Sequence, residues 1–309
     1  MQKEVEEMRR MFDVDEGSWR DGTFWRKERT DIRVGLMRYR VHLWGAGRMI
    51  HGALYPIFNC RVIRRARLNE TTEAQKNVNW RNSRERLILL AETNFTEEKD
   101  SFLTLTYAGA IPDFDRCYKD ISNYIRKLRR YFRKCGVELK YIYSITDTPD
   151  KQIHIHLVIN GIWDASILQS KWKHGNLDVE KLDNTNQALS GIAKYLYEQN
   201  GKRNKEWLGR HMWNCSENLD EPVERVSDSK VNNRQVKLLV ADVKNNGKEI
   251  FARLYKGYYL VGIPEVKTSS YVDGVYIKFI LCSLNPTHRL CKKKTKNKKR
   301  GKRKIKNSR

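Results

Sequence analysis

Two histidines stand one residue apart in an apolar stretch, QIHIHLVI at residues 152–159. The aliphatic residues around them predict a strand. Because side chains of a strand alternate between its two faces, His154 and His156 would point to the same side. Two imidazole nitrogens on one face can bind a divalent metal ion and leave its other positions for oxygen ligands such as phosphate. The alternative is a pair of hydrogen-bonded histidines on the solvent side of an amphipathic strand, which a bare His-x-His pattern favours unless its surroundings argue otherwise.

Two further strands are predicted beside the histidines. SFLTLTY at 101–107 is rich in β-branched and aromatic residues, with Phe102, Thr104 and Thr106 on one face. KYIYSIT at 140–146 precedes a DTPDK turn, so we expect residues 140–159 to form a hairpin. The opposite face of the histidine strand would be buried against a helix, since it carries only aliphatic residues: Ile153, Ile155, Leu157 and Ile159.

Helical periodicity predicts helices at residues 79–95, 115–135 and 186–199. Gly136 fits the C-terminal end of the second of these helices. That helix has a basic face that could follow a nucleic-acid backbone or simply be solvated: Arg126, Lys127, Arg129, Arg130, Arg133 and Lys134. Residues 216–285 read as β-rich and hairpin-like, with an Asn-Asn-Gly turn at Asn245 to Gly247. The predicted fold class is α+β, with a central antiparallel sheet that carries the His-x-His strand and has helices packed on it.

The charge of the chain indicates a polyanionic partner. The 309 residues carry a net charge of +24, and residues 292–309 contribute twelve cations and no acid. Removing these twelve charges leaves +12, so the body of the chain is basic as well. Lys and Arg neutralise phosphates and give sequence-independent affinity for nucleic acid. A solubilising tail or a membrane-surface patch is the alternative, but a basic body favours nucleic acid.

Three motifs in order strengthen the metal hypothesis: FLTLTY at 102–107, HIHLVI at 154–159 and a helix with Tyr195 and Tyr197. This set resembles the rolling-circle replication initiator (Rep) proteins of the HUH endonuclease superfamily, of the plasmid and single-stranded DNA phage type. The resemblance covers about residues 80–225 and implies a site-specific DNA endonuclease and strand transferase. It implies nicking and rejoining of single-stranded origin DNA through a covalent 5′-phosphotyrosine, with a divalent metal, Mn²⁺ or Mg²⁺.

The resemblance also implies roles for individual residues. Tyr195 in AKYLYEQ is the expected nucleophile, with Tyr197 as the alternative. His154 and His156 would be metal ligands. Many members of the family carry a lysine three residues after the tyrosine; here that position is Glu198, and Lys194 is the candidate substitute. Many also carry a glutamate about eight residues before the first histidine. Here the candidate third ligand is Asp147, which otherwise only shapes the turn.

Competing hypotheses are an HUH relaxase or transposase-like strand transferase, and a basic nucleic-acid-binding protein without catalytic activity. Relaxases usually carry the tyrosine before the histidines, and here the tyrosine helix follows them. The predicted regions are a basic N-terminal region (1–79), an HUH endonuclease domain (80–225), a β-rich C-terminal region (226–291) and a basic disordered tail (292–309).

The expected setting is the cytoplasm of a bacterial host. The charged N-terminus has no apolar segment of a secretory signal, and no run of about 18 apolar residues predicts a membrane span. The expected partners are single-stranded and origin DNA, a host helicase and a host DNA polymerase, because the chain has no GxxxxGK[ST] sequence to power unwinding. No membrane and no small-molecule substrate are expected.

Overall fold

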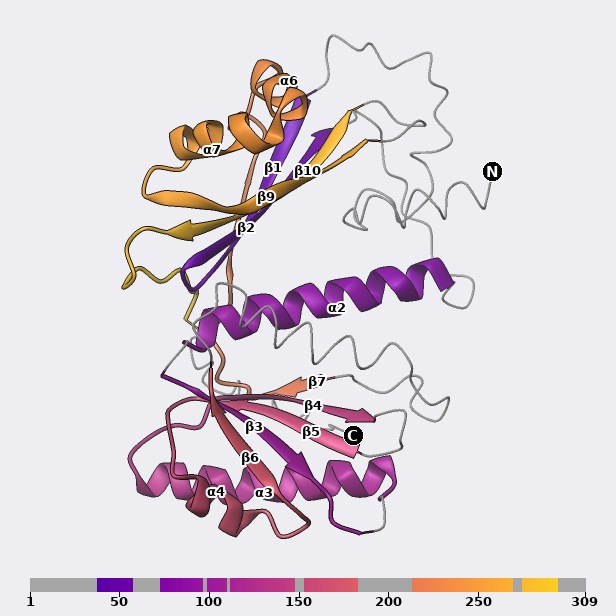
Figure 1. Cartoon of the computed structure of the whole chain (residues 1–309), viewed down its shortest axis with the longest axis vertical. Helices are drawn as coiled ribbons and strands as arrows, with labels where there is room; N and C mark the ends of the chain where they lie inside the picture. The colour runs from indigo at the N-terminus through magenta and orange to yellow at the C-terminus, as the bar shows by residue number, and fades with distance from the viewer. Residues whose placement is uncertain are drawn as a thin grey trace, which may run out of the picture.

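The computed structural model describes residues 38–57, 73–96, 99–109, 112–147, 153–182, 213–268 and 274–293. These residues form two five-stranded antiparallel sheets and five helices, which confirms the α+β class (Figure 1). The sheet that contains the two histidines is called the histidine sheet, and the other is called the second sheet. One long helix, α2 (Glu73–Asn94), lies between them (Figure 1).

The histidine sheet has the strand order β6-β3-β5-β4-β7, so the strand with both histidines, β5, is central. The predicted hairpin is confirmed, because β4 and β5 pair antiparallel from Tyr141–Ile159 to Asp147–Ile153. The strands of this sheet are β3 (Ser101–Thr106), β4 (Tyr141–Asp147), β5 (Ile153–Ile159), β6 (Leu177–Lys181) and β7 (Trp213–Cys215).

One face of the histidine sheet is covered by α3 (Phe114–Lys134) and the short α4 (Ala165–Lys171), as Figure 1 shows. The predicted helix at 115–135 is therefore confirmed. Its first turn is capped by Asp113, whose side chain accepts a hydrogen bond from the Arg116 backbone N at 2.7 Å. Gly136 follows with φ 74°, which suits a glycine after the last turn. The alternating aliphatic residues of β3 and β5 pack on the apolar stripe of α3, with buried residues that include Leu103, Leu105, Ile155, Leu157, Ile121, Leu128 and Phe132.

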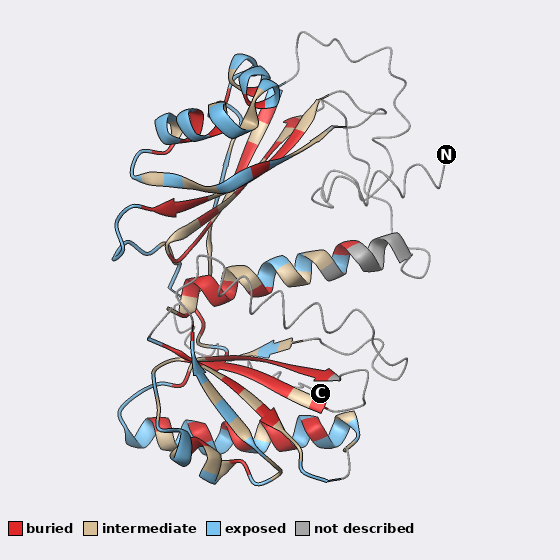
Figure 2. Ribbon diagram, in the orientation of Figure 1, coloured by how far each residue is buried: buried red, intermediate tan, exposed pale blue. Residues whose placement is uncertain are grey.

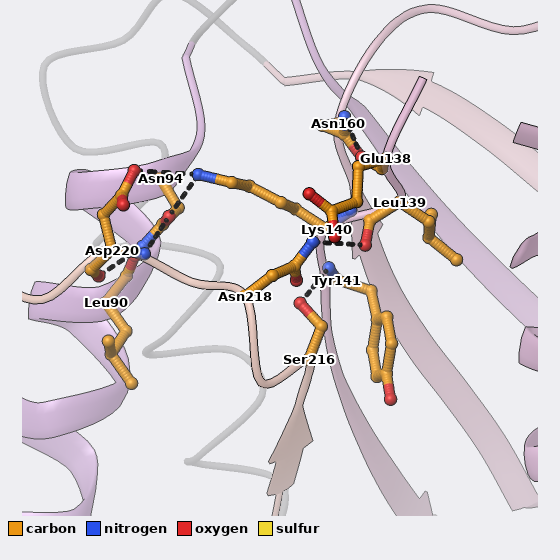
Figure 3. Close-up of polar contacts among 10 residues, drawn as sticks. All are labelled: Leu90, Asn94, Glu138, Leu139, Lys140, Tyr141, Asn160, Ser216, Asn218 and Asp220. Carbon is orange, nitrogen blue, oxygen red and sulfur yellow. Dashed lines mark hydrogen bonds and ion pairs between the residues drawn. The ribbon is translucent and has the colours of Figure 1, made fainter. Parts of the chain in front are cut away.

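The other face of the histidine sheet is partly covered by α2. Leu87, Leu90 and Ala91 of this helix are buried in one cluster with Ile142 and Val158 of the sheet. Figure 3 shows a polar contact that fixes the end of the helix, where Lys140 Nζ lies 3.0 Å from Asn94 Oδ1 and 2.9 Å from Asp220 Oδ2. The helix begins at Glu73, six residues before the predicted start at 79, and ends at Asn94 as expected within one residue.

The second sheet has the order β8-β1-β2-β10-β9 and joins residues from both ends of the described chain. Sequence patterning missed its first two strands, and the predicted boundary after residue 225 falls inside β8. The strands are β1 (Arg38–Ala46), β2 (Met49–Ile57), β8 (Val223–Ser227), β9 (Tyr258–Thr268) and β10 (Val275–Ser283).

The prediction of a β-rich region at 216–285 was wrong for its middle part. Two helices stand there, α6 (Asn233–Ala241) and α7 (Val243–Leu254), and they pack on one face of the second sheet (Figure 1). Asn232 and Gln235 form a reciprocal capping box at the start of α6, and Asp242 caps α7. The Asn-Asn-Gly stretch lies inside α7 and makes no turn, because the caps place a helix start just before it.

Candidate functional site

His154 and His156 lie on the face of β5 that points away from α3. Their ring centroids are 6.2 Å apart, and His156 is only 2% exposed whereas His154 is half-buried. An imidazole nitrogen binds a divalent metal at about 2.1 Å, so two rings around one ion have centroids at most about 6.4 Å apart. The observed separation is within that limit, and two nitrogens from one strand are a donor set that suits a divalent transition metal.

The surroundings of His156 favour a neutral, oriented ring. Phe102 stacks on it with an interplanar angle of 8° and a centroid distance of 5.6 Å. Thr104 Oγ1 lies 3.3 Å from Nδ1 of His156. Burial, followed by the neighbouring charge of His154, lowers the pKa of His156 to about 4. The ring is therefore neutral near pH 7, as a metal ligand must be, and Nε2 is the nitrogen that would bind an ion.

Hydroxyl side chains surround the two histidines on the neighbouring strands. The register places Thr104 and Ser144 on either side of His156, and Thr106 and Thr146 on either side of His154. Within the described residues, no group of three or more His, Cys, Asp or Glu side chains is placed to hold a metal ion. Two imidazoles are therefore the nitrogen donors that this part of the chain provides, and oxygen ligands must come from elsewhere.

Asp147, the predicted third ligand, ends β4 at the turn of the hairpin. Its backbone pairs with Ile153, one row beyond the row that joins Thr146 and His154. Its place in the chain is thus beside the histidines, and its role as a ligand stays a prediction.

Tyr195, Tyr197 and Lys194 lie outside the described residues, as does the helix predicted at 186–199. The described residues at either end of that segment are nevertheless informative. Leu182 is buried in the same cluster as Val158, and Trp213 follows in β7 opposite Ser144. Both ends therefore lie on the side of the sheet that carries the histidines.

The predicted DNA-binding residues are not brought together with the histidines. They are exposed on α3, which covers the opposite face of the sheet (Figure 2). Two of them have partners in the protein: Arg129 Nη2 donates to the Tyr141 hydroxyl at 3.1 Å, and Lys127 Nζ donates to the Lys171 carbonyl at 3.0 Å.

Thr104 and Ser144 were not singled out by sequence reasoning. The alternation in SFLTLTY placed Thr104 on one face of its strand, but the strand partner was not deduced, so its contact with His156 was missed. Only the β3–β5 register brings the two side chains together.

Comparison with known proteins gives one family match. Residues 100–200 match the model of a family of replication-associated proteins, the ORF2 family. The matched stretch starts at β3 and includes the histidine strand and the segment with Tyr195, and it spans about a third of the chain. The match is consistent with a replication initiator and indicates a role in replication, and such a role implies contact with DNA.

Other comparisons add little. The crystal structure of the hypothetical protein ORF119 from Sulfolobus islandicus rod-shaped virus 1 is 14% identical, with a TM-score of 0.28, and the alignment covers 39% of this chain and 96% of that chain. A search of curated proteins finds no match. Among the described helices, none has the length and apolarity needed to cross a membrane.

Proposed function

We propose that the protein is a rolling-circle replication initiator that nicks and rejoins single-stranded origin DNA through a covalent 5′-phosphotyrosine, with a divalent metal. The observation that carries the proposal is the pair His154 and His156 on one face of the central strand, with His156 neutral and held by Thr104. The family match over residues 100–200 supports the link to replication. The host helicase, the DNA polymerase and the bacterial cytoplasm belong to this proposal.

His154 and His156 would hold the metal ion, Mn²⁺ or Mg²⁺, through their ring nitrogens, and Asp147 would supply an oxygen. When bound, the ion polarises the scissile phosphate and stabilises the negative charge that develops on it. The buried position of His156 between Phe102 and Thr104 would keep its ring in one orientation before DNA arrives.

Tyr195 would attack the phosphorus atom, with Tyr197 as the alternative nucleophile. A bond forms from the phenol oxygen to phosphorus, and the bond from phosphorus to the 3′ oxygen breaks. The phenol proton leaves to solvent and the departing 3′ oxygen takes one up, which gives a free 3′-hydroxyl and a 5′-phosphotyrosine. Lys194 would stabilise the phosphate charge. Attack by a 3′-hydroxyl reverses the step and rejoins the strand without a nucleotide cofactor.

The test is a nicking assay on single-stranded DNA from the protein's own replicon, with Mn²⁺ and then with a chelator. Wild type should cleave only with metal, and His154→Ala and His156→Ala should each lower cleavage by at least about a hundredfold. His288→Ala, a change at an exposed histidine of the second half of the chain, is the matched control and should leave cleavage unchanged.

The outcome also separates the competing functions. Binding of DNA without cleavage, unaffected by the chelator, would overturn the proposal and favour a non-catalytic binding protein. Cleavage that requires double-stranded transposon ends or a relaxase-type transfer origin, and not the replication origin, would favour the relaxase or transposase class.

A further inference from the structure

A stripe of cations runs along the outer face of α3. Each residue of an α-helix turns it by about 100° and advances it by about 1.5 Å. Four exposed cations therefore fall within about 60° of one another around the axis and extend over about 21 Å. They are called the α3 stripe and are Lys119, Arg126, Arg130 and Arg133.

No acid neutralises the α3 stripe within the described part of the chain. Between Lys119 and Lys134 the helix contains a single acid, Asp120, which is 6% exposed and lies near Arg116 and His174. Among the described residues, no hydrogen bond or ion pair involves a side chain of the stripe. The flanking Lys127 and Lys134 add to the same positive surface. Such a concentration of unpaired cations attracts a polyanion.

The α3 stripe and the histidines lie on opposite sides of the histidine sheet. The inner face of α3 packs on Leu103, Ile155 and Leu157, and the histidines alternate with these residues on the other face of β5 (Figure 1). A DNA strand held at the histidines therefore does not lie on the stripe. The stripe needs a ligand of its own.

The side chains of the α3 stripe can contact phosphates but not stack on bases. Single-strand binders combine a basic groove with exposed aromatic rings. On α3, Tyr124 and Phe132 are buried, and Lys171 Nζ lies over the Tyr131 ring at 4.5 Å from its centroid. Tyr118 is exposed but lies about 90° around the helix from the middle of the stripe. A cationic stripe without aromatic rings suits a paired backbone, where the bases are turned inward.

We propose that the α3 stripe is a second DNA-binding surface, which holds the phosphate backbone of double-stranded DNA while the histidine face acts on a single strand. The contact is inferred from the α3 side chains, and the use of DNA as the polyanion rests on the proposed function. The protein would then hold the duplex next to the strand that it cleaves.

The experiment uses the full chain with Arg126→Gln, Arg130→Gln and Arg133→Gln combined. Gln has nearly the helix propensity of Arg, and the three positions are exposed, so the fold should be kept. The control combines Lys237→Gln, Lys244→Gln and Lys248→Gln, three exposed cations of α6 and α7. Affinity for a duplex oligonucleotide and for a single strand of the same length is measured over a range of salt concentrations.

The stripe variant should lose at least about tenfold in duplex affinity, and its plot of log K against log[salt] should be less steep by about 2 to 3. The control should change neither. Unchanged duplex affinity, an equal loss in the control, or a loss limited to the single strand would overturn the proposal. Nicking by the wild type is measured in parallel. A stripe effect without nicking would refute the proposed function alone, and nicking without a stripe effect would refute this inference alone.

Discussion

The Thr104 hydroxyl lies 3.3 Å from Nδ1 of His156, across the β3–β5 pair. A contact of this kind is typical of histidines that bind metals through their other nitrogen, because it fixes the orientation of the ring. The contact gives Thr104 a role on the face of β3 that points away from α3.

Thr104→Val removes the hydroxyl and keeps the shape of the side chain. Because the ring of His156 would lose its fixed orientation, we expect Mn²⁺ affinity to fall by about tenfold, measured by calorimetry without DNA. Thr106→Val is the matched control, since Thr106 lies on the same face of β3 and donates to the Asn176 carbonyl instead of a histidine. Equal affinity in wild type and Thr104→Val would contradict an orienting role.

The contact between His51 and Glu92 predicts a pH-dependent stability. His51 Nε2 lies 2.6 Å from Glu92 Oε2 and joins β2 to α2. Burial lowers the pKa of His51, but the charge of Glu92 and its hydrogen bond outweigh burial, and the net effect raises the pKa above its ordinary value. The contribution to stability is therefore complete below about pH 6.5 and is lost as the pH rises through the raised pKa.

Chemical denaturation between pH 6 and 9 measures this effect. Wild type should lose stability as the pH rises, and His51→Gln should show a flatter profile and be less stable at pH 6 by about 1 to 2 kcal/mol. His288→Gln, at an exposed position, should keep the wild-type profile. A His51→Gln profile parallel to that of wild type would show that the pair does not couple proton binding to folding.

Lys140 should stabilise the packing of α2 on the histidine sheet. Its ammonium contacts Asn94 of the helix and Asp220 of the following segment (Figure 3). Lys140→Met should lower the free energy of unfolding by about 1 to 2 kcal/mol, because Asp220 keeps its charge without its partner. Lys237→Met on the exposed face of α6 should cost less than about 0.5 kcal/mol. A similar cost in both variants would show that the contact adds nothing.

The basic residues 292–309 should add non-specific affinity for DNA. Deleting them removes twelve cations, so DNA binding should weaken most at low salt and differ little from that of the full chain at high salt. Filter binding or fluorescence anisotropy over a salt series measures the difference. Equal binding by the two chains at low salt would show that these residues contribute no affinity.

The elements around the histidines could be predicted because their patterns are local. β3, the β4–β5 hairpin and α3 each have clear alternation or helical periodicity, and Gly136 marks the end of α3. The placement of the histidines on one face follows from strand geometry alone. Their partner Thr104, in contrast, depends on a pairing between strands about fifty residues apart, which no local pattern specifies.

The second sheet was not predicted for a similar reason. Its strands β1 and β2 pair with β8 and β10, more than 180 residues later in the chain. The stretch around Asn245 illustrates a different failure, because the turn-forming Asn-Asn-Gly sequence follows a helix cap at Asp242. The cap and the buried positions Ile250 and Phe251 decided the local structure in favour of α7.

The most direct test of the central claim is to find the covalent adduct. The protein is incubated with Mn²⁺ and single-stranded origin DNA and digested, and the peptides are examined by mass spectrometry. The account predicts a nucleotide-linked tyrosine on the peptide with Tyr195 and Tyr197, with fragmentation placing it on Tyr195, and no adduct in the His156→Ala variant or with chelator. No adduct, with DNA binding intact and indifferent to metal, would contradict it and leave the two histidines as structural residues of the central strand.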